Sequence, residues 1–163
     1  MSIKKFLKEI VFTVLMVFVV SMVLNYIRQP EIHENIYDYT LKDINQETID
    51  FSTYKEKPLV VHFWATWCPT CKLEASNIDE VSKTNNVVSI AVTSGSNSEI
   101  KTFLKEKNLN FKVINDKDGV LAQKFNISAF PTTLIYDTNG SLKFTEVGYT
   151  TTLGLKTRIQ LAE

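Results

Sequence analysis

The longest apolar run of the chain lies near its start. Residues 10–27, IVFTVLMVFVVSMVLNYI, run for 18 residues without a charge, and Lys4, Lys5 and Lys8 precede them. As a helix this run is about 27 Å long, close to the ~30 Å hydrocarbon thickness of a bilayer. It predicts a transmembrane anchor over residues 10–27 and a cytoplasmic tail over residues 1–9, because flanking lysines stay in the cytoplasm.

A cleaved secretory signal is the alternative to an anchor. Such a signal has a shorter apolar core and ends at a small-residue cleavage site. Here the run ends SMVLNYIRQP, without a good small-residue pair. We therefore expect an uncleaved anchor, a linker over residues 28–36 and a domain over residues 37–163 outside the cytoplasm. A mature N-terminus near residue 28 would refute the anchor.

The remaining chain alternates strand-like and helix-like patterns, which favours a mixed sheet with helices on both faces. Residues 37–52 have alternating apolar positions on either side of the turn-forming Asn45, which predicts a β-hairpin. The run LVVHFW at 59–64 is apolar except for His62 and predicts a central strand buried on both faces. We expect further strands at 87–92, 111–114, 132–137 and 142–147, and helices at 69–83, 98–108, 120–125 and from 151 onward. In the first of these helices Cys71, Ala75 and Ile78 stand at i, i+4 and i+7 and should form its inner face.

Charge and composition argue against several functional classes. The chain has 18 basic and 18 acidic residues. Without the tail's three lysines and one glutamate, 15 basic and 17 acidic residues remain, so no basic patch indicates a nucleic-acid partner. There is no internal repeat, and no nucleotide, flavin or haem motif. We expect neither a cofactor nor a resident metal.

The only two cysteines, Cys68 and Cys71, stand three positions apart between a predicted strand and a predicted helix. Cys68 is expected at the helix N-terminus, where free N–H groups and the helix dipole favour a negative charge. A thiol with an unperturbed pKa of about 8.5 is only ~3% ionised at pH 7, and the thiolate is the reactive form. Cys71, one turn further on, is expected beneath Cys68, where it would resolve a mixed disulfide. The pair is therefore interpreted as a redox dithiol.

A structural disulfide and a metal site are the alternatives to that interpretation. Closing a four-residue ring removes only about 2 kcal/mol of unfolded-state entropy. A closed zinc site needs four ligands, and beyond the thiols only His33 and His62 are available. His33 lies in the linker. Both alternatives are weaker than a redox dithiol.

The segment LVVHFWATWCPTCKLE resembles the active-site segment of thioredoxin-fold proteins, specifically the membrane-anchored TlpA/ResA/DsbE group and the related ScsD-type disulfide oxidoreductases. The likeness runs from YDYTLKDINQETIDFSTYKEKPLVV, through FWATWCPTC, to FNISAFPTTLIYDTNGSLKFTEVGYT. It implies a thioredoxin-like three-layer α/β/α sandwich with an N-terminal β-hairpin, preceded by one transmembrane helix. It also implies thiol–disulfide exchange with protein clients, and a location at the bacterial cytoplasmic (inner) membrane with the catalytic domain in the periplasm or outside.

Three candidate substrate-binding residues follow from the resemblance. Pro131, in AFPTT, matches the family's cis-proline, whose loop faces the cysteine pair and contacts the substrate segment. A proline that opens a strand also fits a sheet margin or a tight turn. Phe130, just before it, and Trp67, just before Cys68, are expected to shape the substrate groove, although Phe130 is equally well explained as a core aromatic.

Two candidate proton relays lie near the cysteines in the sequence. Glu74 matches an acidic residue that several members of the group keep just after the cysteines, and a partly desolvated carboxyl could pass a proton to or from Cys71. A solvated helical glutamate is the alternative. His62 stands where thioredoxin has a buried aspartate, and an imidazole that titrates near neutrality could act instead. A hydrogen-bonded interior histidine is the favoured alternative there.

The dipeptide between the cysteines, Pro69-Thr70, departs from the thioredoxin and ResA patterns, which place proline second. Pro69 suits the first turn of a helix. Thr70 leaves an N–H and a hydroxyl near the Cys68 sulfur, which should favour the thiolate. We therefore predict that this pair is more oxidising than the pair of thioredoxin, whose reduction potential is about −270 mV. A measured potential at or below that value would refute this prediction.

The direction of electron flow is not determined by the sequence. A reductase would take electrons from a transmembrane DsbD/CcdA-type donor and keep client thiols reduced, for instance in cytochrome c maturation. An oxidase or isomerase would act on folding secreted proteins. A Sco-like copper metallochaperone is the alternative function, but such proteins use a CxxxC spacing and a downstream histidine, and no histidine follows His62. A peroxidase function is disfavoured, because the sequence lacks the catalytic threonine context that a peroxidase requires.

Overall fold

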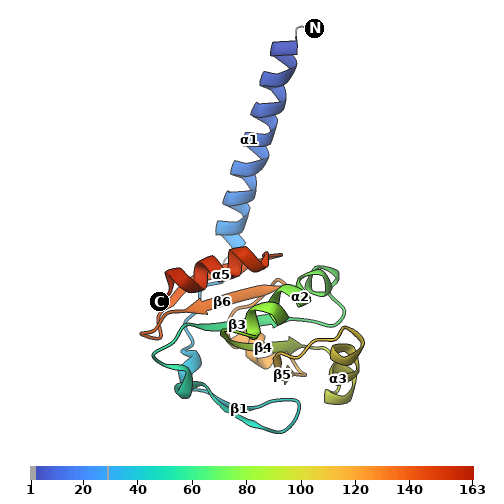
Figure 1. The fold of residues 1–163 in the computed structure, drawn as a ribbon, viewed down its shortest axis with the longest axis vertical. Helices are drawn as coiled ribbons and strands as arrows, with labels where there is room; N and C mark the ends of the chain where they lie inside the picture. The colour runs from blue at the N-terminus through green and yellow to red at the C-terminus, as the bar shows by residue number, and fades with distance from the viewer. Residues whose placement is uncertain (1–2, 29) are drawn as a thin grey trace.

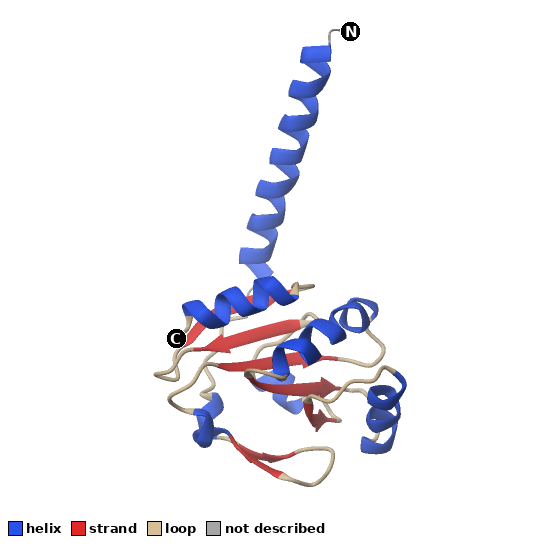
Figure 2. Cartoon of the chain, viewed as in Figure 1, coloured by secondary structure: helices blue, strands red, loops and turns tan. Residues whose placement is uncertain are grey.

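The computed structural model describes residues 3–28 and 30–163. Two small strands, a five-stranded sheet and the helices that pack on it make up the domain (Figures 1 and 2). The helices are α1 (Ile3–Arg28), α2 (Pro69–Ser82), α3 (Asn97–Glu106), α4 (Val120–Lys124) and α5 (Thr152–Leu161), with short 3-10 helices η1 (Ile36–Asp38) and η2 (Phe51–Tyr54). The strands are β1 (Thr40–Lys42), β2 (Thr48–Asp50), β3 (Leu59–Trp64), β4 (Asn86–Val92), β5 (Lys112–Asp116), β6 (Thr132–Tyr136) and β7 (Leu142–Val147).

Strand β3 is the centre of the main sheet, whose order is β5-β4-β3-β6-β7. It pairs parallel with β4 and antiparallel with β6, and all six of its residues are buried. The central strand predicted from the continuous apolar run is therefore confirmed. Because β3 ends in the interior of the sheet, the loop that follows it begins at the middle of the domain.

Helices cover both faces of this sheet, so the expected three-layer arrangement is confirmed. Alternate side chains of β3 point to opposite faces, as strand geometry requires. Val60 and Trp64 pack in one core with buried residues of α2, α3 and α5. Leu59 and Phe63 pack in a second core with η1, η2 and α4. The side chains at even-numbered positions of β3 therefore face α2, the helix that carries the cysteines.

The predicted hairpin is present within residues 37–52 as a separate two-stranded sheet of β1 and β2, but it is shorter than expected, because residues 37–38 belong to η1 and residues 51–52 to η2. Its turn depends on Asp43, whose Oδ1 accepts hydrogen bonds from the backbone N–H of Asn45 at 2.7 Å and of Glu47 at 2.9 Å. The N–H of Ile44 donates to the Val113 carbonyl at 2.9 Å and ties the turn to β5. The hairpin is thus fastened to the edge of the main sheet.

Helix α1 projects away from the sheet, and its C-terminal end approaches β7 (Figure 1). No helix within the described residues reaches the length and apolarity that crossing a bilayer requires. The transmembrane anchor expected over residues 10–27 is therefore not confirmed. The expected tail and linker include residues 1–2 and 29, which lie outside the described residues. Ile36, placed at the end of the expected linker, is fully buried in the second core.

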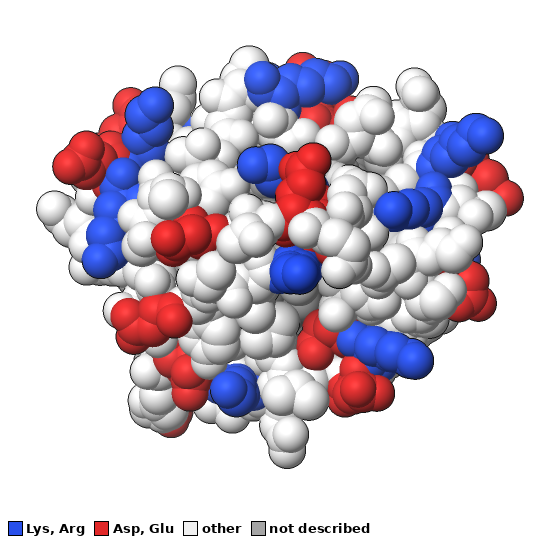
Figure 3. Space-filling model, turned by 90° about the horizontal axis from the view of Figure 1, so that it is seen from below, with Lys and Arg blue, Asp and Glu red and all other residues white. Residues whose placement is uncertain are grey.

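The end of the molecule farthest from α1 has a mixed charge pattern. In Figure 3 lysine and arginine side chains alternate with aspartate and glutamate across this face, and neither sign forms a continuous patch. A mixed surface of this kind gives little long-range electrostatic steering.

Candidate active site

Cys68 is the N-cap residue of α2, directly after the loop that leaves β3. Pro69 occupies the first turn of the helix, where its missing N–H has no intrahelical role. The N–H of Cys71 donates to the Cys68 sulfur at 3.2 Å. A helix N-terminus also places a partial positive charge at this point. The local chain therefore offers two features that favour a thiolate at Cys68.

Cys68 and Cys71 form a disulfide, with their Cα atoms 5.3 Å apart. Cys68 is 5% exposed and Cys71 is 1% exposed. Cys71 also packs in the core between α2 and the sheet, beside Ala75 and Ile78. Both sulfurs are therefore shielded, and Cys68 is the more exposed of the two.

The loop before β6 faces the cysteine pair. The Phe130–Pro131 peptide bond is cis, as the family resemblance implied. The Phe130 carbonyl oxygen lies 3.6 Å from the Cys68 sulfur. Pro131 directly precedes β6, and its carbonyl accepts a hydrogen bond from Gly148 at 2.8 Å. The hydrogen bond from Gly148 thus fixes the loop on the sheet, with the Phe130 carbonyl beside the Cys68 sulfur.

Trp67 lies on the surface beside Cys68 and is 57% exposed. Its indole N–H donates to the Thr93 carbonyl at 3.2 Å, and its ring meets Phe130 edge-on at 5.9 Å between centroids. The side chain is therefore exposed but held in place. Ser94 fixes the same loop, because its hydroxyl accepts the N–H of Thr66 at 3.0 Å. A fixed, exposed aromatic side chain next to a reactive sulfur is suited to contact a partner.

Glu74 is completely buried, which excludes the alternative of a solvated helical glutamate. It follows Cys71 by three residues and so lies on the same inward side of α2. Its Oε1 accepts a hydrogen bond from the Thr150 N–H at 2.9 Å, and Oε2 has no partner among the described residues. Burial is the main cause that raises the pKa of Glu74 to about 7; the hydrogen bond from Thr150 opposes this rise, and the negative charge of Glu146 adds to it.

His62 lies in the interior, 2% exposed, on the α2 side of β3. Its Nδ1 is 2.9 Å from the hydroxyl of Thr133, its register partner on β6. Burial lowers the pKa of His62 to about 3. The imidazole is therefore neutral at pH 7. His62 is therefore an interior, hydrogen-bonded histidine.

Three residues of the site were not found from the sequence: Thr150, Asn77 and Thr93. Thr150 supplies the amide that holds Glu74, Asn77 holds the loop that contains Thr150, and Thr93 holds Trp67. Each acts through a backbone group or across a large separation in the chain. No local pattern marks such contacts, although the Cys71, Ala75, Ile78 stripe does pass over Glu74 and was a usable signal for its burial.

Comparison with known proteins agrees with this geometry. The AhpC/TSA family model matches residues 32–145. A thioredoxin-like protein of Haemophilus influenzae is 31% identical over 165 residues, which covers 100% of this chain and 98% of the relative. The thiol-disulfide oxidoreductase ResA of Bacillus subtilis is 31% identical over 109 residues, 64% of this chain and 61% of ResA.

Solved structures of related enzymes share the fold. A secreted Mycobacterium tuberculosis disulfide oxidoreductase homologous to Escherichia coli DsbE superposes with a TM-score of 0.67 at 27% identity, covering 76% of this chain and 95% of that one. StoA from Bacillus subtilis superposes with a TM-score of 0.62 at 26% identity, covering 73% and 93%. The likeness to thiol–disulfide oxidoreductases thus holds in sequence and in structure. The protein is a thioredoxin-fold thiol–disulfide oxidoreductase with a Cys68–Cys71 pair, and the chain belongs to the AhpC/TSA family.

Proposed function

We propose that Cys68 is the attacking sulfur and Cys71 the resolving sulfur of a protein thiol–disulfide exchange. In the reducing direction the Cys68 thiolate attacks one sulfur of a client disulfide, the client S–S bond breaks, and the leaving client thiolate takes up a proton. The Cys71 thiolate then attacks Cys68, which forms the Cys68–Cys71 bond and releases the second client thiol. Two electrons pass from the dithiol to the client. In the oxidising direction every step runs in reverse.

The observation that carries this proposal is the setting of the Cys68 sulfur. It caps α2, accepts the N–H of Cys71 at 3.2 Å, and lies at the cis-proline loop. Helix N-termini favour a nearby anion by 0.3 to about 1 kcal/mol, and by about 2 kcal/mol where partly buried. That range is comparable to the roughly 2 kcal/mol that makes an ordinary thiol half ionised at pH 7.

Glu74 is the proton carrier for Cys71 in this proposal. A pKa of about 7 keeps a carboxyl near half protonation at neutral pH, where it both accepts and donates readily. Because Thr150 occupies Oε1, the proton belongs on Oε2, the oxygen without a partner. We assign the step to Glu74 and not to His62, because burial lowers the pKa of His62 to about 3.

Trp67, Phe130 and Pro131 form the client-binding surface in this proposal. Trp67 directly precedes Cys68, the Phe130 carbonyl lies 3.6 Å from the Cys68 sulfur, and Pro131 follows Phe130 in the same loop. The indole and phenyl rings are in edge-on contact. An extended client segment that presents its cysteine to Cys68 would lie across these side chains. The apolar rings contribute contact area, and the surface selects for apolar residues beside the client cysteine.

We further propose that residues 10–27 anchor the chain in the bacterial cytoplasmic (inner) membrane, with residues 37–163 in the periplasm or outside. The run is uncharged, and its side chains Phe12, Val14 and Phe18 are exposed on α1. Relatives are named as a secreted antigen of Mycobacterium tuberculosis and an exposed lipoprotein of Streptococcus pneumoniae. A DsbD/CcdA-type donor fits the reductase direction. Protease accessibility in intact spheroplasts tests this placement, and complete protection of the domain would refute it.

Trapping tests the central proposal directly. A Cys71→Ser variant of the full chain should accumulate mixed disulfides with client proteins, because the bond to Cys68 forms and is not resolved. The matched Cys68→Ser variant should accumulate none. Equal trapping by both variants would refute the assignment of the two sulfurs. The redox state of the wild-type pair in living cells then gives the direction, since a mainly reduced pair indicates a reductase.

A further inference from the structure

The loop between β7 and α5 provides the only hydrogen bond that the described structure gives to the Glu74 carboxylate. It begins at Gly148, whose φ of 97° is in the left-handed region, and ends at Thr151, the N-cap of α5. Thr150 lies between them, is 8% exposed and points its N–H at Glu74 Oε1. The position of this amide therefore depends on what keeps the loop against α2.

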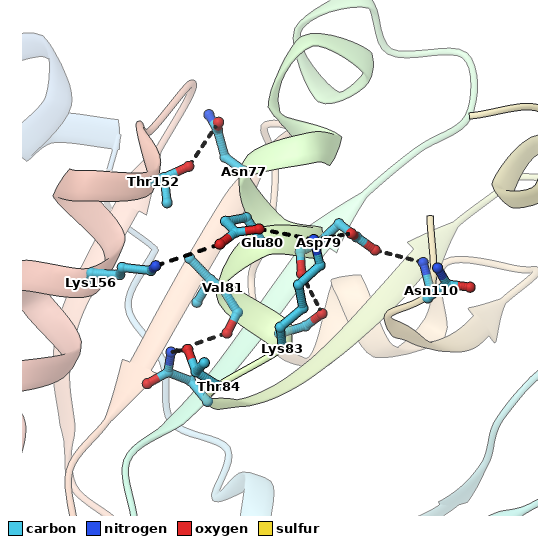
Figure 4. A network of polar contacts seen from close by, with 11 residues as sticks. Asn77, Asp79, Glu80, Val81, Lys83, Thr84, Asn110, Thr152 and Lys156 are labelled. Atoms are coloured by element: carbon cyan, nitrogen blue, oxygen red, sulfur yellow. Dashed lines mark hydrogen bonds and ion pairs between the residues drawn. The ribbon is translucent and has the colours of Figure 1, made fainter. Parts of the chain in front are cut away.

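Asn77 makes that connection from α2. Its Nδ2 donates to the Thr150 carbonyl at 3.0 Å and to the Tyr149 hydroxyl at 3.1 Å. Its Oδ1 accepts from the Thr152 hydroxyl at 3.0 Å. Figure 4 shows Asn77 of α2 and Thr152 of α5 pointing toward one another. One side chain thus contacts three of the four residues from 149 to 152.

Asn77 and Glu74 both form hydrogen bonds with the backbone of Thr150. Asn77 follows Glu74 by three residues, so both lie on one side of α2. Glu74 accepts the N–H of Thr150, and Asn77 donates to its carbonyl oxygen. Both backbone polar groups of Thr150 are therefore satisfied by α2. If Asn77 no longer binds the Thr150 carbonyl, the Thr150 N–H is held less firmly against the Glu74 carboxylate.

We propose that Asn77 is a positioning residue, which holds the Thr150 amide on Glu74 and so fixes the pH at which Glu74 gains and loses its proton. This inference rests on the proposed function of Glu74 for its importance in exchange. The physical reason is that an N–H donor stabilises a carboxylate and not its neutral form. Without the donor, the carboxylate is still buried away from water but no longer has the hydrogen bond that offsets this cost, so its pKa rises.

A change at Asn77 should leave Cys71, Glu146 and Arg158 in place, because none of the printed contacts of Asn77 is to these groups. Cys71 lies one turn earlier on α2. Glu146 of β7 acts on Glu74 through its charge and is itself paired with Arg158 of α5. None of these groups contacts Asn77 in the described structure. A change at Asn77 should therefore reach Glu74 through the loop.

The test compares Asn77→Ala with Lys156→Gln in the full chain in detergent. Alanine preserves the helix. Lys156 links α5 to α2 through Glu80 at 3.8 Å, so its replacement loosens the same helix pair without touching Thr150 (Figure 4). Carbon-13 NMR of the glutamate carboxyl carbons, with the Glu74 signal identified by its loss in Glu74→Gln, follows the titration in the disulfide form.

In Asn77→Ala the titration midpoint of Glu74 should rise by about one pH unit, a roughly tenfold gain in proton affinity, because a hydrogen bond to a charged group is lost. The Thr150 N–H should also exchange faster with solvent. Lys156→Gln should leave both unchanged. An unchanged midpoint in Asn77→Ala, or an equal shift in both variants, would overturn the inference.

Two further results keep this inference separate from the proposed function. If Asn77→Ala does not fold, the combined Tyr149→Phe and Thr152→Val variant loosens the Asn77 side chain from both neighbours. It should shift the midpoint in the same direction by less, and no shift would overturn the inference. If the Glu74 midpoint moves in Asn77→Ala while the pH profile of exchange does not, the positioning role of Asn77 stands and the proton role of Glu74 fails.

Discussion

Replacing Glu74 with glutamine should change how the stability of the protein depends on pH. Burial raises the pKa of Glu74 from 4.5 to about 7, so between these values the folded protein holds a proton that the unfolded chain releases. The stability from this group is complete below pH 4.5 and is lost as the pH rises through about 7. Glutamine keeps an oxygen for the Thr150 N–H and does not ionise.

The size of the effect follows from the shift. One pKa unit corresponds to about 1.4 kcal/mol, so ionising Glu74 costs the folded state about 3 kcal/mol relative to the unfolded chain. His62 acts in the opposite sense, because burial lowers its pKa from 6.5 to about 3 and stability therefore rises with pH up to 6.5. The two slopes oppose one another between pH 4.5 and 6.5. Both proteins contain His62, so its contribution cancels when the unfolding free energy of wild type is subtracted from that of the variant. The remaining pH dependence comes from Glu74.

Urea unfolding of the oxidised full chain in detergent, from about pH 4.5 to about pH 8, measures this difference. Relative to wild type, Glu74→Gln should gain about 1.4 kcal/mol of unfolding free energy per pH unit and level off above pH 7 after a gain of about 3 kcal/mol. Glu80→Gln is the matched control, since Glu80 is an exposed carboxylate on the same helix. A difference that stays constant over the whole range would refute the argument for a buried, proton-holding Glu74.

Two more predictions concern neighbours of the cysteine pair. Trp67→Ala should slow exchange with disulfide-bonded protein clients by about tenfold through lost contact area, and should leave exchange with a small disulfide reagent unchanged; Leu161→Ala, which removes an exposed apolar side chain from the end of α5, is the control. Equal slowing with both substrates would contradict a client-binding role. Thr133→Val should cost about 1 to 3 kcal/mol of unfolding free energy, because the His62 ring loses its buried partner. The pH profile of exchange near neutrality should not move, and a profile that did move would return the proton role to His62.

The order of elements and the place of the cysteines were determined by the sequence. The alternation of residues 37–52, the continuous run at 59–64 and the spacing of Cys71, Ala75 and Ile78 are each set by the geometry of a single strand or helix, so they can be seen locally. The position of a CxxC pair directly after a central strand also requires no tertiary information. It places Cys68 at a helix N-terminus, and the structure confirms that placement.

The chemistry of the side chains around the pair was decided only by the tertiary structure. Glu74 meets Thr150 across 76 positions of the chain, and His62 meets Thr133 across 71. Which of these groups titrates near neutrality depends on how completely each is desolvated and which dipoles face it. Those quantities are properties of packed surfaces from separate segments. The sequence alone named both Glu74 and His62 as candidate proton relays and favoured an interior role only for His62, whereas the packing raises the pKa of one and lowers that of the other.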